Sequence, residues 1–517
     1  MRRFCFFIVL LLIRAVNPLP AQHWQGVSLG NYAGTNSLYH NPAFAADSRY
    51  SVFVNLAGFN YYVANNHVKW DAPFSFPTYI TNTASDEYRT DKGTIFFPRR
   101  YLEQRLNGNL KYLNSGVDFR LPSLLITLKN GRFGLGFNTR TRAILNVSQT
   151  TQDLARLIRG STQDEDLHGT DFVEQSGKMG VNAFAEYSAT VGGVLIDQET
   201  IFVKVGITAK RVIGIAQSRV EIEKANYRII PDPAWNNSRY MTRVMSVDGT
   251  THYTSDEGVA SASLNPSWWL TGTSAPGNGW GLDVGAVFEY RPDINSFKNF
   301  GTGTDPVRDP SLNKYLYRVA VSLTDLGILN YNNTYYNFTQ TAQNARGNLD
   351  YNSFNPLTSI NNFYDAVERT LNIPEATPAK TRAMLPMALQ ASIDYKLKPN
   401  LYVSALGVLP LTRAENMNMY QESVISLIPR YERRWVEVSV PISLMNRYRS
   451  FGVGLAGRVG PLWVGTDHIP AFINAGKPKT FTFYAGLSMG LFRKPLSDEI
   501  PCWPPKQNLF KNLFKKN

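Results

Sequence analysis

The feature that most constrains this chain is the alternation of apolar and polar residues with a period of two. At residues 133–142, phenylalanine and leucine alternate with glycine, asparagine and arginine, and at residues 201–210 isoleucine and valine alternate with Lys204 and Lys210. Successive side chains of a β-strand point to opposite faces, so this pattern predicts strands. Equivalent patterns occur at residues 281–290, 318–324, 451–459 and 481–491.

Weaker alternation brings the expected total to about 13–16 strands. Many of them are about 10 residues long, which is the length that a tilted strand needs to cross a bilayer. Beyond residue 21, no apolar stretch reaches the 18 residues of a membrane-spanning helix. The chain is therefore predicted to be all-β. The weaker candidates lie near residues 50–59, 117–128, 183–196, 218–229, 240–247, 330–339, 387–397, 400–409 and 433–443.

Two all-β architectures share this pattern. In a soluble sandwich the apolar face is buried between sheets, whereas in a transmembrane antiparallel β-barrel it contacts lipid and the polar face lines the lumen. Three features favour the barrel: the strands are long, they follow an export signal, and their polar face is rich in glycine, which suits a crowded lumen. Alternation alone leaves open which face is inside.

Residues 1–21 have the features of a secretory signal peptide. Arg2 and Arg3 precede a short apolar run, and Ala21 is a small residue where cleavage is expected. The alternative is an N-terminal anchor helix, but Arg14 and two prolines interrupt the run. We therefore expect the mature chain in the outer membrane of a Gram-negative bacterium.

Composition and charge exclude several classes of protein. Charged residues are only 18% and aromatic residues 13% of the chain, which argues against a disordered chain or a coiled coil. The net charge of +13 would suit nucleic acid, but export and the scatter of the charges argue against it. Once Cys5 is removed with the signal, Cys502 is the single cysteine, so we expect no intramolecular disulfide.

Short motifs that resemble catalytic sites fail in their context. Residues 486–490 match G-x-S-x-G, but Ser488 lies inside a predicted strand and no histidine follows it. Residues 452–457 match G-x-G-x-x-G but continue as strand and turn rather than as a helix. The six histidines show no zinc spacing. We predict that the chain is not an enzyme and uses no cofactor and no metal.

Charged residues on the polar faces of the predicted strands are candidates for a polar network inside the barrel. An equally consistent interpretation is lumen filling that excludes open water flow. The residues concerned are Arg140, Arg142, Lys204, Asp283, Glu289, Arg318 and Arg458.

The connections between strands are polar and rich in turn residues. Two of them contain segments that predict loop helices, at residues 150–159 and 358–371. Residues 493–517 form a basic tail with four prolines, and no linker divides the chain before it.

Residues 29–49 contain Asn41-Pro42-Ala43 after a segment rich in glycine and alanine. This stretch resembles the N-terminal signature of FadL-like outer-membrane barrels. Three glycine-rich stretches, at residues 279–292, 317–329 and 452–467, are similar to uncharacterised envelope proteins of that type. The resemblance runs over roughly residues 28–492.

The resemblance implies a barrel of about fourteen antiparallel strands at residues 50–492, with residues 22–49 folded inside it as a plug. Asn41, Pro42 and Ala43 would lie at the junction of plug and first strand, where proline restricts the backbone and asparagine caps the turn. A purely structural turn is the alternative. In FadL itself, hydrophobic substrates bind near the extracellular loops and leave sideways after the plug moves. Substrate-pocket residues cannot be matched here.

Three functional hypotheses follow. The first is a passive channel or transporter for hydrophobic or small amphipathic compounds. The second is a non-transporting outer-membrane scaffold that docks secretion or surface-assembly partners. The third is a soluble secreted β protein. The expected partners are outer-membrane lipid, hydrophobic small molecules and envelope proteins, and we predict no nucleic-acid partner.

Overall fold

The computed structural model describes residues 24–494, apart from 129–130, 237, 265–271, 273, 301–305, 355–358 and 414–418. The predicted signal peptide, both cysteines and nearly all of the basic tail lie outside the described residues.

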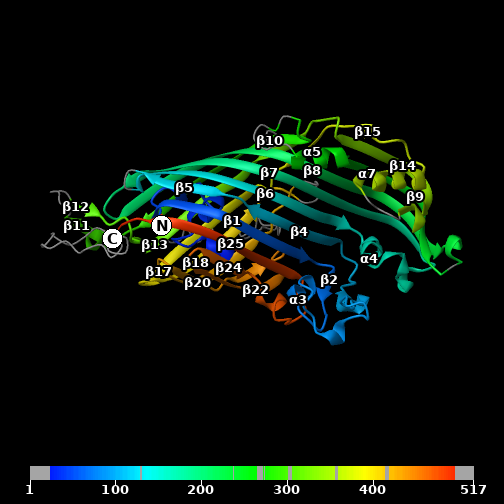
Figure 1. Cartoon of the computed structure of the whole chain (residues 1–517), viewed down its shortest axis with the longest axis horizontal. Helices are drawn as coiled ribbons and strands as arrows, with labels where there is room; N and C mark the ends of the chain where they lie inside the picture. The colour runs from blue at the N-terminus through cyan, green and yellow to red at the C-terminus, as the bar shows by residue number, and fades with distance from the viewer. Residues whose placement is uncertain are drawn as a thin grey trace, which may run out of the picture.

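The strands form a closed antiparallel barrel with fourteen positions, which confirms the predicted fold class. The sheet closes because its first strand, β1, pairs along most of its length with its last strand, β25. Four positions consist of two consecutive strands. In order around the barrel (Figure 1), the positions are β1 (Tyr50–Asn65), β4 (Lys111–Arg120) with β5 (Ser123–Leu128), β6 (Phe133–Thr150), β7 (Asp171–Asp197), β8 (Ile201–Pro231), β10 (Gly277–Tyr290), β13 (Tyr317–Tyr331), β16 (Thr381–Met384) with β17 (Ala388–Lys398), β18 (Leu401–Pro410), β19 (Val424–Glu432), β20 (Val436–Ser439) with β21 (Ile442–Met445), β22 (Ser450–Val453) with β23 (Leu455–Val459), β24 (Leu462–Thr466) and β25 (Thr480–Phe492).

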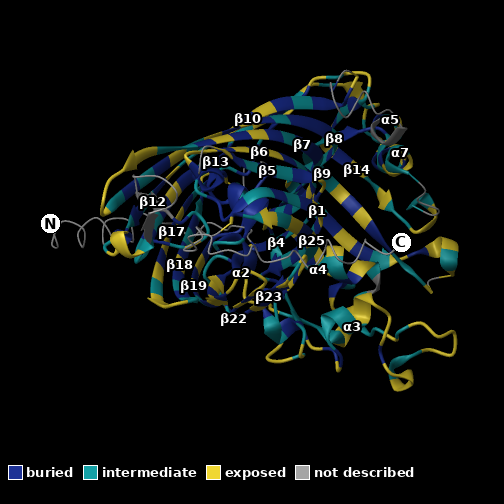
Figure 2. Cartoon of the chain, turned by 60° about the vertical axis from the view of Figure 1, so that its left-hand side comes forward, coloured by how far each residue is buried: buried dark blue, intermediate teal, exposed yellow. Residues whose placement is uncertain are grey.

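The apolar face of the strands points outward. Leu135, Val191 and Ile207 are 45%, 48% and 49% exposed and are paired side by side across β6, β7 and β8. On the opposite face, Arg140 and Lys204 are buried. This polarity, visible as alternating buried and exposed residues along the ribbons (Figure 2), distinguishes a barrel in lipid from a sandwich. No helix among the described residues is both long and apolar enough to cross a membrane.

Four segments that the sequence predicts as continuous strands are interrupted. The candidate at 433–443 is divided between β20 and β21, and the candidate at 330–339 contains the end of β13 and the start of β14. The predicted strand at residues 117–128 is divided between β4 and β5 at Pro122, which has no backbone N–H for the ladder. The predicted strand at residues 451–459 is divided at Gly454, whose N–H donates to the carbonyl of Pro441 at 2.6 Å. Pro441 lies between β20 and β21, so two neighbouring positions of the wall are interrupted side by side at Gly454 and Pro441.

Part of the sheet extends beyond the barrel. The strand β8 runs for 31 residues, so the segments predicted separately at 201–210 and 218–229 are one strand. Its first half pairs with β10, and its second half pairs with β9 (Tyr240–Thr254), which pairs in turn with β14 (Asn337–Leu349). Most of β14 lies beyond the predicted strand candidate at residues 330–339, because its sequence is almost entirely polar and shows no alternation. The extension lies at the end of the barrel where β1 ends and β25 begins (Figure 1), which we call the loop end.

Short helices cover the loop end. The helices α4 (Gln152–Gly160) and α7 (Ile360–Leu371) confirm the two predicted loop helices. The helix α7 begins where the Ser359 side chain accepts a hydrogen bond from the N–H of Asn362, and its Leu371 packs against β9 and β14. The other elements that bear on the sites below are β2 (Val68–Trp70), β3 (Leu102–Gln104), α3 (Phe76–Ile80) and α5 (Asp256–Leu264).

Candidate functional site

Residues 24–49, which we call the N-terminal segment, lie inside the barrel. The segment folds into three short helical turns, α2 (Gln25–Ser28), η1 (Gly34–Tyr39) and η2 (Pro42–Ala45), and almost all of its residues are buried. Its backbone and side chains contact the inward faces of strands all around the barrel. The lumen is therefore filled by the chain's own N-terminal residues.

A row of glycines forms the surface on which η2 sits. Gly134, Gly192, Gly206 and Gly285 pair with one another directly across β6, β7, β8 and β10. A Cβ atom at Gly206 would lie 2.4 Å from the nitrogen of Ala43, and at Gly134, Gly192 and Gly285 it would overlap other atoms of residues 41–46. The glycine row thus lets the backbone of the N-terminal segment lie directly on the wall, a use of glycine that larger side chains prevent.

Asn41 anchors the segment at the end of this row. Its side chain caps η2 by accepting a hydrogen bond from the N–H of Ala43 at 2.9 Å. Its Nδ2 donates to the carbonyls of Ala286 and Val321 at 3.1 and 2.9 Å. Asn41, Pro42 and Ala43 therefore lie against the wall on the glycine row, whereas the first strand begins only at Tyr50.

His40 continues the contact to the next strands. Its Nδ1 lies 2.6 Å from Gln390 Oε1 and its Nε2 lies 3.1 Å from Ser392 Oγ. Burial lowers the pKa of His40 to about 4, so the imidazole is neutral at pH 7. The carbonyl of His40 accepts a hydrogen bond from Ser322, which is paired with Gly285 in the same register.

The charged residues of the inner face form three clusters. The first joins β6, β7, β8, β10 and β13: Arg140 contacts Glu186 at 2.5 Å, and Arg142 contacts Asp325 at 3.0 Å. Lys210 contacts both Asp325 and, at 2.7 Å, Asp283. Each buried charge has an opposite partner, which such burial requires.

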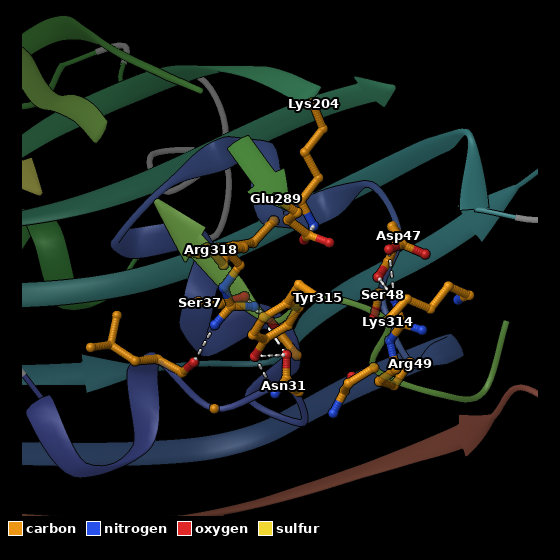
Figure 3. A pocket seen from close by; sticks show the side chains of 15 residues that line it. Asn31, Ser37, Asp47, Ser48, Arg49, Lys204, Glu289, Lys314, Tyr315 and Arg318 are labelled. Carbon is orange, nitrogen blue, oxygen red and sulfur yellow. Dashed lines mark hydrogen bonds and ion pairs between the residues drawn. The ribbon is translucent and has the colours of Figure 1, made fainter. Parts of the chain in front are cut away.

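The second cluster ties the end of the N-terminal segment to the wall (Figure 3). Arg291 bridges Asp47 at 2.8 Å and Glu289 at 2.5 Å. Lys204 lies 3.5 Å from Glu289 and donates to the carbonyl of Ala46 at 3.0 Å. These contacts fasten the segment where it turns into β1.

The third cluster holds the middle of the segment. Arg318 contacts Asp394 at 3.1 Å and donates to the carbonyl of Leu29 at 2.9 Å. Glu432 accepts hydrogen bonds from Asn31, including one from its backbone N–H at 3.1 Å. The cluster continues around the wall through Arg430, Glu437 and Arg458.

The structure therefore distributes the seven predicted lumen charges among three clusters. Arg140, Arg142 and Asp283 are in the first, Lys204 and Glu289 in the second, and Arg318 and Arg458 in the third. The sequence analysis did not name the partners of these charges. Three of the partners, Glu186, Lys210 and Asp394, lie on the polar face of a predicted strand and could have been named by the same criterion. The missed partners are Asp47, Glu186, Lys210, Arg291, Asp325, Asp394, Arg430, Glu432 and Glu437.

Among the residues that the structure describes, three cavities beside the N-terminal segment have volumes of about 30 Å³ each, room for about two water molecules. The cavity nearest the loop end contains the carboxyls of Glu422 and Asp467, and burial raises the pKa of each to about 7. Asp467 accepts a hydrogen bond from the Tyr484 hydroxyl at 2.9 Å, and this hydroxyl accepts one from the N–H of Gly26 at 3.1 Å.

The motifs that resembled catalytic sites are parts of the wall. Ser488 lies within β25, and residues 452–457 run through the bend between β22 and β23. Within the described ranges, no group of three histidine, cysteine or acidic side chains is arranged to hold a metal ion.

A closed antiparallel barrel with an apolar exterior and a charged, filled interior defines the class of outer-membrane β-barrel proteins. Within that class, residues 42–467 match DUF5723, which is described as a family of unknown function, and the chain belongs to this family. None of the curated proteins compared with the chain matches its sequence.

Three solved structures that are similar to the chain are remote in sequence. The toluene transporter TbuX of Ralstonia pickettii is 10% identical with a TM-score of 0.35, covering 93% of this chain and 100% of that one. The toluene transporter TodX of Pseudomonas putida is 8% identical with a TM-score of 0.32, covering 92% and 95%. A FadL homologue of Pseudomonas aeruginosa is 9% identical with a TM-score of 0.26, covering 90% and 96%.

Proposed function

We propose that this protein is a gated outer-membrane channel in which the N-terminal segment acts as a movable plug. The observation that carries the proposal is the glycine row. Because η2 rests on backbone and glycine, no side chain of the wall interlocks with it there. The first ion cluster braces the wall, whereas the hydrogen bonds of Asn41 and the second and third clusters hold the segment itself. These polar contacts must break when the segment leaves. With the plug in place the channel is closed.

The proposed cargo consists of hydrophobic or small amphipathic compounds. A cavity of about 310 Å³ at the loop end is lined largely by apolar side chains, among them the aromatic rings of Trp70, Phe97 and Phe481, as sites for small apolar ligands commonly are. It shares Val63 and Thr480 with a lumen cavity. The two cavities therefore lie on either side of β1 and β25, close to the last pair of that ladder, Ala64 with Thr480. Compounds collected there would enter the lumen over this rim.

Locking the plug tests the proposal. The Cβ of Ala45 lies 2.9 Å from the position of a Cβ at Gly192, within about 1 Å of the usual spacing in a disulfide. We expect the double variant Ala45→Cys and Gly192→Cys, in a Cys502→Ser background, to slow efflux of anilinonaphthalene sulfonate from proteoliposomes when oxidised. Reduction should restore the efflux, and the single Ala45→Cys variant should not respond to oxidation. Equal efflux in both redox states would contradict the gate.

A second candidate function is a docking scaffold, which the extended sheet favours. β8, β9 and β14 build a folded structure beyond the barrel that a simple pore does not need. A photo-crosslinker at Tyr335, 69% exposed beside β14, should then form a stoichiometric adduct with an envelope protein in intact cells. Absence of any adduct from this position would count against the scaffold.

A further inference from the structure

A small lobe, residues 66–105, folds against the outside of the barrel wall at the loop end. The wall positions beneath it follow from alternation: the Tyr484 hydroxyl points into the lumen, where it accepts a hydrogen bond from Gly26, so Phe481 and Phe483 on the same strand point outward. Phe76 of the lobe packs on Phe481 with ring centroids 4.7 Å apart. Figure 1 shows the lobe, with β2 and α3, beside the wall rather than over its mouth.

The lobe has its own aromatic core and leaves a cavity against the wall. Trp70 is at the centre of this core, with Phe97 at 5.3 Å and Phe76 at 5.2 Å, and its indole N–H donates to the carbonyl of Phe74. The cavity of about 310 Å³ described above lies between these rings and the outward face of β25. A cavity with a mostly apolar lining on the outward face of a barrel wall has the chemistry to receive a hydrocarbon chain.

Positive charge gathers at this cavity without enough carboxylates to balance it. Lys479 lines the cavity. Lys69 and Lys477 share Glu103, and Lys477 also pairs with Asp71. Among the described residues, neither Lys479 nor the exposed Arg105 has a carboxylate partner. Four cations thus surround two carboxylates.

The surroundings of Lys479 support this imbalance. Burial and the neighbouring charges of Arg105 and Lys69 lower the pKa of Lys479, and only Glu103 opposes them. Cations near a membrane surface attract anionic lipid by about 1 kcal/mol each. In outer-membrane barrels the longer loops face the cell exterior, so the lobe would stand at the outer leaflet.

We propose that this cavity binds one hydrocarbon chain of a phosphate-bearing lipid of the outer leaflet, with Lys479 and Arg105 against the phosphate. The apolar cavity would then bind the hydrocarbon chain, and the adjacent cations would bind the head group of the same lipid. The inference holds whether or not the barrel conducts, because it concerns the outside of the wall. If the barrel does conduct, an apolar cargo must displace this chain before it crosses the rim.

Lipid retention tests the inference directly. The full chain is reconstituted in vesicles of equal parts phosphatidylglycerol and phosphatidylcholine, extracted in mild detergent, and weighed by native mass spectrometry. We expect one phosphatidylglycerol retained per barrel in preference to phosphatidylcholine. Lys479→Gln should reduce this preference about fivefold, as expected from the loss of roughly 1 kcal/mol. Lys92→Gln, which removes an exposed cation elsewhere in the lobe, is the matched control and should leave it unchanged.

A cavity-filling variant separates the chain from the head group. Val68 lines the cavity and is only partly buried, so Val68→Trp should abolish retention of both lipids while the barrel still shows a heat-modifiable mobility. Equal retention of the two lipids by the unsubstituted protein, no retained lipid, or normal retention by a folded Val68→Trp barrel would each overturn the inference. None of these measurements depends on efflux through the barrel. Their outcome is therefore independent of the disulfide experiment that tests the channel.

Discussion

At the scale of single residues, the absence of a side chain at the glycine row lets the N-terminal segment lie against the wall. Gly192 and Gly193 are neighbours on β7 with opposite surroundings. A Cβ at Gly192 would lie 2.9 Å from atoms of Ala45 and Ala46, whereas a Cβ at Gly193 would make only an ordinary contact of 3.6 Å with Phe133. A side chain at Gly192 on the inner face would therefore clash with the N-terminal segment, whereas a small side chain at Gly193 on the outer face would fit.

We expect Gly206→Ala to unseat the N-terminal segment. The added methyl group meets the backbone of Pro42 and Ala43 at 2.4 Å, and backbone cannot rotate away as a side chain can. Overpacking of this kind costs about 1–3 kcal/mol, which raises the unseated fraction by roughly 5- to 150-fold. Efflux of anilinonaphthalene sulfonate from proteoliposomes should rise accordingly. Gly193→Ala is the matched control, and equal efflux from both variants would show that the row does not seat the plug.

At the scale of the strands, each inward row has an outward counterpart one residue away. The glycine row contains Gly206, and the next residue, Ile207, belongs to an outward apolar row with Val191 and Val284. One face of this short stretch of β8 therefore supports the N-terminal segment, and the opposite face contacts lipid. A one-residue slip of register would exchange them, so the pairing is strongly specified.

We expect Ile207→Arg to destabilise the barrel by about 2–4 kcal/mol if Ile207 lies near the bilayer midplane. Ile207 is 49% exposed between Val191 and Val284, so the arginine would face hydrocarbon without a partner. Equilibrium unfolding in urea from lipid vesicles measures the loss. Ile158→Arg on α4, where the side chain is 70% exposed, should change the free energy of unfolding by less than about 0.5 kcal/mol. Equal losses at both positions would place Ile207 outside the membrane.

At the scale of the whole molecule, closure depends on contacts between the beginning of the chain and strands near its end. Asp467 follows β24, yet its carboxyl accepts a hydrogen bond from Tyr484, whose hydroxyl accepts one from the N–H of Gly26. Burial there raises its pKa from 3.8 to about 7. The seated state therefore keeps a proton on Asp467 between about pH 4 and 7, where a solvated carboxyl has lost it.

Rising pH should favour release of the N-terminal segment. Release exposes Asp467 to water, so the released state binds fewer protons in this window, and the free energy of release falls as the pH rises. We expect efflux to increase between pH 5 and 7 and then to level off. Asp467→Asn should reduce this rise, and the double variant with Glu422→Gln, which removes the other raised carboxyl of the cavity, should flatten it. Asp91→Asn in an exposed turn should leave it unchanged. A rise that survives in the double variant would assign the titration to another group.

Several parts of this architecture could be predicted from local sequence. The alternation at residues 133–142 and 201–210 predicts β6 and the first half of β8, and helical spacing predicts α4 and α7. The polar face of these strands also named Arg140, Arg142 and Lys204. By contrast, most of β14 was missed because its residues are polar on both faces, outside the lipid and packed partly on α7.

The sequence by itself determined that the chain alternates in long strands and that one face of each is apolar, because the two-residue period is a local property of the backbone. Only the tertiary structure decided which face is inside, since alternation is the same for a sandwich and a barrel. The pairing of β1 with β25 closes the sheet across more than four hundred residues. That closure turns the apolar face to lipid and aligns four glycines, from separate strands, beneath one turn of the N-terminal segment.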